Sequence, residues 1–267
     1  MLNKKSLDFI RMNKQGKGDF LKREIISYFE DINFEYWAKR LSHISLKLRK
    51  LKTNKARSPY LIDCYSVYLQ LLEIFFINIL SLSFEEKNFF RYLFISNVKL
   101  RKCVEDNFLS LSFQRRMMED YVFGIKDKHK IKEYNKLYTE HIKIIKECVK
   151  DYLEDYDFLN AYKHGFRAKA LFGNMKVGVG GYQIFQGDSQ ITYYSQKDNH
   201  ILKCNIIFSH KRILVKSFFI VEMLKNAQKV FLAQGEKKRI TLNHHYIKGV
   251  DDWKKSFGTA RFKTEIL

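Results

Sequence analysis

The sequence predicts a mainly α-helical fold: a multi-helix bundle with a small antiparallel β-hairpin or meander inserted at about residues 176–208, before a final long helix. Apolar residues recur every three to five positions over most of the first 166 residues, which is helical spacing. Pro59 is the single proline in 267 residues, so long helices can run without interruption. Beyond Arg167, glycines cluster and the apolar spacing changes to alternation, which predicts strands.

The first half of the chain is expected to hold several helices. Helical spacing runs from Phe20 to about Lys52, where the basic run 47–57 interrupts it. We expect that run to be a solvated helix end, with contact to an RNA backbone as the alternative. Ser58 and Pro59 have the form of an N-cap and first helical position. The helix that they open carries one apolar face, and further helical patterns cover 83–108, 112–123, 128–150 and 152–166.

The second half changes character and then returns to helical spacing. Short strands are predicted at 177–179, 182–184, 191–193 and 201–208, with turns at 186–188 and 197–199. Ser209 is a plausible N-cap for the final long helix, and a short strand is possible at 239–242. A sheet of so few short strands cannot bury enough surface to fold as a separate domain. We therefore expect one elaborated helical domain, with a polar arm at 1–19, a bundle at 20–170, a β insertion at 171–208, a returning helix at 209–234 and a tail at 235–267.

The charge of the chain is strongly positive. Its 49 Lys and Arg residues against 29 Asp and Glu give a formal net charge of +20. Such an excess attracts polyanions, above all nucleic acid. The alternative is that an AT-rich genome supplied the lysines, which then serve only solubility. Both interpretations stay open from composition alone.

The cysteines and the apolar stretches point to an intracellular protein without a membrane span. Cys64, Cys103, Cys148 and Cys204 have no C-x-x-C spacing for zinc and are expected to be reduced and buried. The N-terminus has no apolar core of a secretory signal. The longest apolar stretch, 69–84, is too short and too polar to span a bilayer and predicts a buried helix. We expect a cytoplasmic location.

The segment from Asn160 to Gly165 carries the candidate chemistry. Asn160 and His164 are four residues apart, so on a helix they share one face. Lys163 and Arg167, also four apart, flank that face. Gly165 predicts that the helix ends there, where backbone can approach a ligand. One short surface therefore offers an amide, an imidazole and two cations.

This Asn-x-x-x-His pattern on a late helix resembles the signature of HEPN (higher eukaryotes and prokaryotes nucleotide-binding) proteins. Many members of that family are metal-independent ribonucleases of toxin–antitoxin and phage-defence systems. The apolar helix 61–82 would be the matching earlier helix of the bundle. In the family, an arginine precedes the asparagine, whereas this chain has Leu159 at that position.

The resemblance implies roles for the four polar residues. His164 would transfer protons at the ribose 2′-hydroxyl or the leaving 5′-oxygen, and Asn160 would orient the imidazole or the phosphate. Lys163 and Arg167 would bind the phosphate and stabilise its developing charge. No cofactor and no metal would be required. RNA would be the substrate, a homodimer the expected assembly, and an antitoxin a possible further partner.

Two other functions stay open. A catalytically inactive HEPN-like module would bind a partner protein or nucleic acid, an idea motivated by Leu159. A peripheral membrane or nucleoid protein would use only its charge. His164 itself has an alternative as a histidine that the helix dipole stabilises at a C-terminus. His244 and His245 are a poor chelating pair, and His129 and His141 are expected to be solvated.

Overall fold

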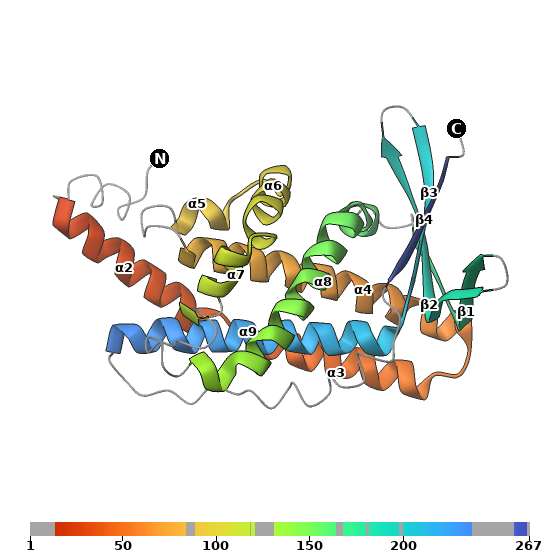
Figure 1. The fold of residues 1–267 in the computed structure, drawn as a ribbon, viewed down its shortest axis with the longest axis horizontal. Coiled ribbons are helices and arrows are strands. Elements are labelled where there is room, and N and C mark those ends of the chain that lie inside the picture. Colours follow the sequence, from red (N-terminus) through yellow and green to blue (C-terminus); the bar gives the residue numbers. More distant parts are fainter. Residues whose placement is uncertain are drawn as a thin grey trace. The chain divides into compact units, whose positions relative to one another are not determined.

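A computed structural model of the protein describes residues 14–83, 89–117, 119–120, 131–163, 168–179, 182–197, 200–236 and 259–265. Helices precede the sheet, and one long helix follows it (Figure 1). The elements in chain order are α2 (Lys14–Asp31), α3 (Glu35–Lys50), α4 (Asn54–Ser83), α5 (Phe89–Leu93), α6 (Asn97–Phe108), α7 (Leu111–Met117), α8 (Ile131–Lys163), β1 (Ala168–Val179), β2 (Tyr182–Lys197), β3 (His200–Phe208), α9 (His210–Glu236) and β4 (Ala260–Glu265).

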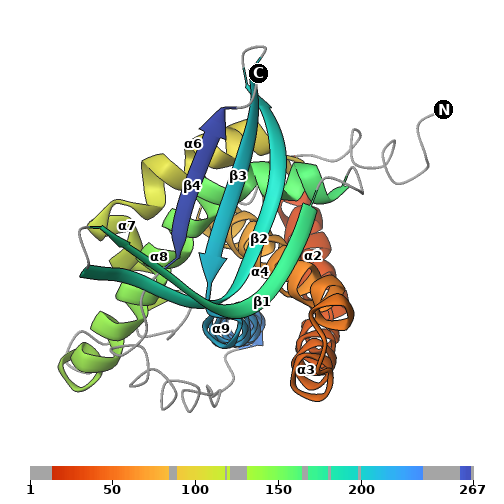
Figure 2. The ribbon, with the colours of Figure 1, turned by 90° about the vertical axis from the view of Figure 1, so that its right-hand side faces the viewer.

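The prediction of a mainly helical fold with an antiparallel sheet before the last long helix is confirmed. The sheet is larger than expected, because it has four strands in the order β1-β2-β3-β4 (Figure 2). Its fourth strand, β4, comes from the tail, where the sequence indicated only a polar end, and it pairs antiparallel with β3. The strand expected at 239–242 lies outside the described residues.

The chain divides into two compact units. One comprises residues 1–34, 75–132 and 223–242, and the other comprises 35–74, 133–222 and 243–267. Both α4 and α9 contribute a segment to each unit. The expected organisation as one elaborated domain stays a prediction.

The core of the first unit is aromatic. Phe29, Phe89 and Ile25 are buried together, and the ring centroid of Phe29 lies 5.8 Å from that of Phe89 and 4.7 Å from that of Phe231. A second aromatic contact joins Phe108 to the α4 residue Phe76, edge to face, with ring centroids 4.7 Å apart. Burial of large rings of this kind is the dominant favourable contribution to folding.

Helix boundaries differ from the sequence prediction at several places. The pattern at 83–108 is divided between α5 and α6, and the patterns at 128–150 and 152–166 belong to the single helix α8. The pattern from 20 to 52 is two helices, because α2 ends at Asp31 and α3 begins at Glu35. The Gln228 side chain donates hydrogen bonds to the backbone carbonyls of Phe29 and Ile32, so it satisfies groups that a helix end leaves without partners. Helix α4 begins at Asn54, so the start predicted at Ser58 is wrong.

The true start of α4 has a cap of its own. The hydroxyl of Thr53 accepts a hydrogen bond from the backbone N–H of Ala56 at 3.3 Å, which is N-cap geometry. Pro59 is therefore inside the helix, close to its beginning. The Arg57 side chain, near the start of α4, donates a hydrogen bond to the backbone carbonyl of Leu51, before the helix. Its guanidinium also lies over the ring of Phe172, 4.1 Å from the ring centroid. This residue is half-buried, so the expectation that the whole basic run is solvated is wrong there.

Helix α4 is buried over most of its surface. Residues on every side of it are buried, including Leu61, Tyr65, Val67, Leu71 and Phe75, so the predicted single apolar face is wrong and the predicted buried helix is confirmed. Within the part of the chain that the structure describes, α4 alone has the length and apolar character to cross a membrane. Of its most apolar window, 67% is buried inside the protein.

The sheet belongs to the second unit, and one of its faces is apolar. Ile191 and Tyr193 of β2 and Cys204 and Ile206 of β3 are buried on that face. The turn predicted at 186–188 is wrong, since β2 runs through these residues and Gly187 stands opposite Met175 beside an irregularity of the ladder. Of the turn predicted at 197–199, residues 198–199 lie outside the described residues; on either side of them Lys197 of β2 pairs with His200 of β3.

Candidate functional site

The expected site lies at the end of α8. The helix stops at Lys163, so the predicted helix end close to Gly165 is confirmed. Asn160 and Lys163 lie in its last turn, and their side chains are outside the described part of the structure. His164 and Arg167 fall in the segment 164–167, which is also outside it. The meeting of these four side chains therefore stays a prediction.

The residues around Asn160 show how this end of α8 is held. Phe158 and Leu159 are fully buried and Ala161 is almost so. The ring of Phe158 lies 5.5 Å from that of Tyr65 on α4 and 5.6 Å from that of Tyr193 on β2, both edge to face. The position at which HEPN proteins have arginine is thus part of the apolar core here, and no cation reaches a surface from it.

A cation from a different helix lies close to the motif residue Tyr162. The hydroxyl of Tyr162 donates to Oδ1 of Asp63 on α4 at 3.2 Å, and Nη2 of Arg40 on α3 donates to the same oxygen at 2.9 Å. Partial burial alone would lower the pKa of Arg40, but the charge and hydrogen bond of Asp63 outweigh it and raise that pKa. Sequence reasoning missed Arg40, because nothing local connects α3 with the end of α8.

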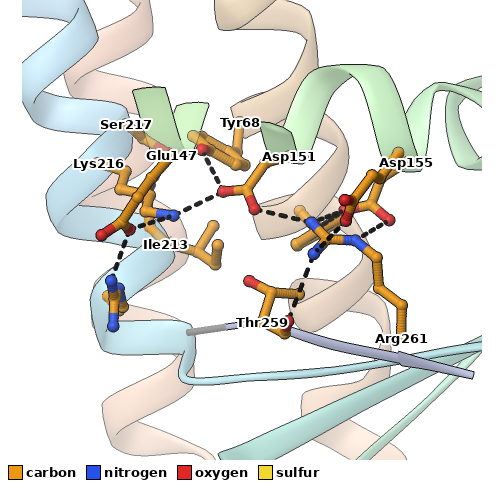
Figure 3. A network of polar contacts seen from close by, with 12 residues as sticks. Tyr68, Glu147, Asp151, Asp155, Ile213, Lys216, Ser217, Thr259 and Arg261 are labelled. Carbon is orange, nitrogen blue, oxygen red and sulfur yellow. Dashed lines mark hydrogen bonds and ion pairs between the residues drawn. The ribbon is translucent and has the colours of Figure 1, made fainter. Parts of the chain in front are cut away.

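Further up α8, two buried carboxylates form an ion network with α4, α9 and β4 (Figure 3). Asp151 accepts hydrogen bonds from Nζ of Lys216 at 2.6 Å, from the hydroxyl of Tyr68 at 2.7 Å and from Nη2 of Arg261 at 2.7 Å. Burial by itself would raise the pKa of Asp151, but the two cations outweigh it and lower that pKa. Lys216 is 1% exposed and remains charged because this carboxylate is beside it.

Asp155, one helical turn beyond Asp151, binds Arg261 through both carboxylate oxygens. Nε of Arg261 donates to Oδ1 at 2.8 Å, Nη2 donates to Oδ2 at 2.7 Å, and the Tyr65 hydroxyl also donates to Oδ2. Burial raises the pKa of Asp155 to about 6, against the opposing hydrogen bonds and charge of Arg261. Asp151, the neighbouring negative charge, adds to the rise.

This network positions α8. Two buried carboxylates face two cations, and Glu147 at the rim pairs with Arg212 and with Lys216 at 3.2 Å. Breaking a buried pair of this kind costs far more than an exposed one, since the remaining charge is left without a partner. The pairs therefore fix the rotation of α8 against α4 and α9, and with it the face on which Asn160 lies. One signal in the sequence could have found them: charged residues interrupt the apolar stripes of α8 and α9.

A second imidazole is held at the start of α9. Nδ1 of His210 lies 2.9 Å from Oδ1 of Asp188, and the same oxygen accepts the backbone N–H of His210 at 2.9 Å. Burial favours a higher pKa for Asp188, but its hydrogen bonds from His210 outweigh this and lower it. The predicted helix start after Ser209 is confirmed, with the carboxylate of Asp188 bound to the first N–H. This arrangement caps a helix.

Several expectations for single residues can be compared with their surroundings. His141 was expected to be solvated, which is wrong, because it is fully buried against the ring of Phe219 at 5.2 Å. The four cysteines are free thiols, three of them buried and Cys103 partly so. Among the described residues, no group of three or more His, Cys, Asp or Glu side chains is placed to hold a metal ion. His129, His244 and His245 lie outside those residues.

Comparison with known proteins yields no relative. No family model matches the chain, no curated protein sequence matches it significantly, and neither does any solved structure.

Proposed function

We propose that the protein is a HEPN-like, metal-independent endoribonuclease or RNA-binding effector of a bacterial defence or toxin system, acting in the cytoplasm. The observation that carries the proposal is the spacing of Asn160 and His164 at the point where α8 ends, beside residues that anchor that end of the helix. The net charge of +20 supports a polyanionic substrate.

The proposed reaction uses this chain's own side chains. His164 takes the proton of a ribose 2′-hydroxyl, whose oxygen attacks the adjacent phosphorus. The bond to the 5′-oxygen breaks, and that oxygen takes up the proton from the imidazolium, which restores the neutral imidazole. Asn160 orients the imidazole or the phosphate. Lys163 and Arg167 stabilise the charge that builds on the phosphate oxygens. A homodimer would bring two such helix ends to one cleft.

Cleavage of RNA by the purified protein tests the proposal. In buffer with a metal chelator, we expect the wild-type chain to cut cellular RNA, and His164→Ala to lower the rate by about 10²–10⁴-fold. His200→Ala is the matched control, since it removes an exposed imidazole on β3 and should leave the rate unchanged. RNA left intact by the wild-type protein across several substrates would rule out the enzyme.

The burial of Leu159 favours a second candidate, a catalytically inactive module that binds RNA or a partner protein such as an antitoxin. An active family member has a cation at this position, whereas here the position belongs to the core. In that case the wild-type protein binds RNA or its partner without cleavage, and His164→Ala binds equally well. Binding and cleavage measured on the same preparations separate the two candidates.

A further inference from the structure

A groove lies where α5 turns into α6, in the first compact unit. It has a volume of about 560 Å³, within the usual size range of ligand sites. Its wall holds three cations, two aromatic rings and one carboxylate among other residues: Arg91, Tyr92, Phe94, Lys99, Lys102 and Asp106. The two helices and the turn between them are seen in Figure 1.

The aromatic part of this groove is open to solvent to an unusual degree. Phe94, in the turn after α5, is 86% exposed. Val98, the second residue of α6, does not line the groove but follows its residue Ser96 closely in the sequence, and it is 80% exposed. A large apolar side chain gains nothing from such exposure, and clustered exposed apolar groups mark binding surfaces. The half-exposed ring of Tyr92 lies in the same wall.

The charges of the groove favour an anionic ligand. Arg91, Lys99 and Lys102 outnumber the single carboxylate of Asp106. Lys99 and Lys102 are one turn apart on α6, so both project from the same side of the helix. None of these three cations forms an ion pair with a residue that the structure describes. Their charges are therefore available to phosphate groups.

We infer that this α5–α6 groove binds single-stranded RNA, with bases stacked on Phe94 and Tyr92 and the sugar–phosphate backbone along Arg91, Lys99 and Lys102. Cations beside exposed rings are the combination that single strands require, because each base has a face for stacking and each linkage has a charge. A duplex keeps its bases stacked on one another, so it has no use for the rings. The inference that a single strand stacks and pairs its charges here depends only on the residues of the groove. The choice of RNA over DNA rests on the proposed function.

Fluorescence anisotropy with a labelled 12-nucleotide adenine RNA tests this binding in the full-length chain. Phe94→Ala should weaken the affinity about tenfold. Leu109→Ala, which removes another exposed apolar side chain just after α6, should have no effect. The double variant Lys99→Gln/Lys102→Gln should weaken binding and reduce the salt dependence by about 0.7 per lost phosphate contact. Lys143→Gln/Lys146→Gln on α8 measures the effect of losing two exposed cations elsewhere.

Two results would overturn the inference. If Phe94→Ala binds as tightly as the wild type, the surface attracts polyanions without stacking on them. If polyglutamate displaces the RNA as effectively as unlabelled RNA of equal length does, the groove is a site for an acidic protein. Thermal melts of each variant monitor folding, and the exposure of Phe94 makes a fold defect in its variant easy to exclude.

The same preparations distinguish a failure here from a failure of the proposed function. His164→Ala should bind the RNA with unchanged affinity and fail to cut it, whereas Phe94→Ala should raise KM and leave kcat nearly unchanged. If His164→Ala still cleaves RNA and Phe94→Ala binds it weakly, the groove is supported as an RNA-binding site and the catalytic role of His164 is ruled out. If His164→Ala does not cleave RNA and Phe94→Ala binds it as tightly as the wild type, the catalytic role of His164 is supported and the groove is ruled out.

Discussion

Tyr162 on α8 donates a hydrogen bond to Asp63 on α4, at 3.2 Å between the hydroxyl and Oδ1. The two residues are 99 positions apart in the chain. Arg40 of α3 binds the same oxygen, so three helices meet at one carboxylate. Because Tyr162 lies between Asn160 and His164 in the sequence, this contact fixes the last turn of the helix that carries them.

Tyr162→Phe should loosen the end of α8. The change removes one partly buried hydrogen bond, which stabilises the folded state by about 1 kcal/mol. Amide hydrogen exchange of residues 158–163, measured by mass spectrometry, should accelerate several-fold relative to the wild type. Tyr194→Phe, at a more exposed tyrosine of β2, is the matched control and should leave exchange in α8 unchanged. Equal exchange in all three proteins would show that the contact does not hold the helix end.

Placing an arginine at position 159, as in the HEPN pattern that this segment resembles, should destabilise the fold. Leu159 is fully buried, so Leu159→Arg places a charge in the core without a partner. We expect a loss of about 3–5 kcal/mol in the free energy of unfolding, measured by urea titration. Leu159→Met keeps the volume and should cost less than about 1.5 kcal/mol. A stable, more active Leu159→Arg protein would contradict the burial of this side chain.

The free energy of unfolding should depend on pH through the ionisation of Asp155. Its pKa is raised in the folded state to about 6, so folding favours the protonated carboxyl. That contribution is fully present below the unfolded pKa of about 4 and is lost as pH rises through 6. The stability of the wild type minus that of Asp155→Asn should therefore fall by about 1.4 kcal/mol per pH unit between about pH 4 and 6, and then level off.

Glu154→Gln is the control for that measurement. Glu154 pairs with Arg261 at 2.7 Å from the adjacent position of α8, yet it is much more exposed than Asp155. Glu154→Gln retains Asp155. Its free energy of unfolding minus that of Asp155→Asn should therefore fall with pH as steeply as the difference for the wild type does. Urea titrations at half-unit pH steps provide the comparison. A difference that is constant with pH would mean that folding does not raise the pKa of Asp155.

The long helices and the inserted sheet could be predicted, because helical and alternating apolar spacing are local properties of a sequence. Residues typical of turns and caps gave wrong predictions where contacts with residues distant in the sequence decided the local structure. Gln186–Asp188 has turn composition, yet β2 continues through it, and Asp188 instead caps α9, 22 residues further on. Ser58 and Pro59 have cap chemistry, yet the helix begins earlier, at the cap that Thr53 provides.

The sequence by itself determined the helical class, the place of the sheet and the end of α8 at the motif, since each depends on the spacing of neighbouring residues. Only the tertiary structure decided that Leu159 is core, that Arg40 reaches Asp63, and that Lys216 and Arg261 neutralise the carboxylates of α8. The physical reason is that a buried charge or a fourth strand is stable only beside its partner. Those partners lie 65 or more residues away for Asp151, and more than 50 residues away for β4.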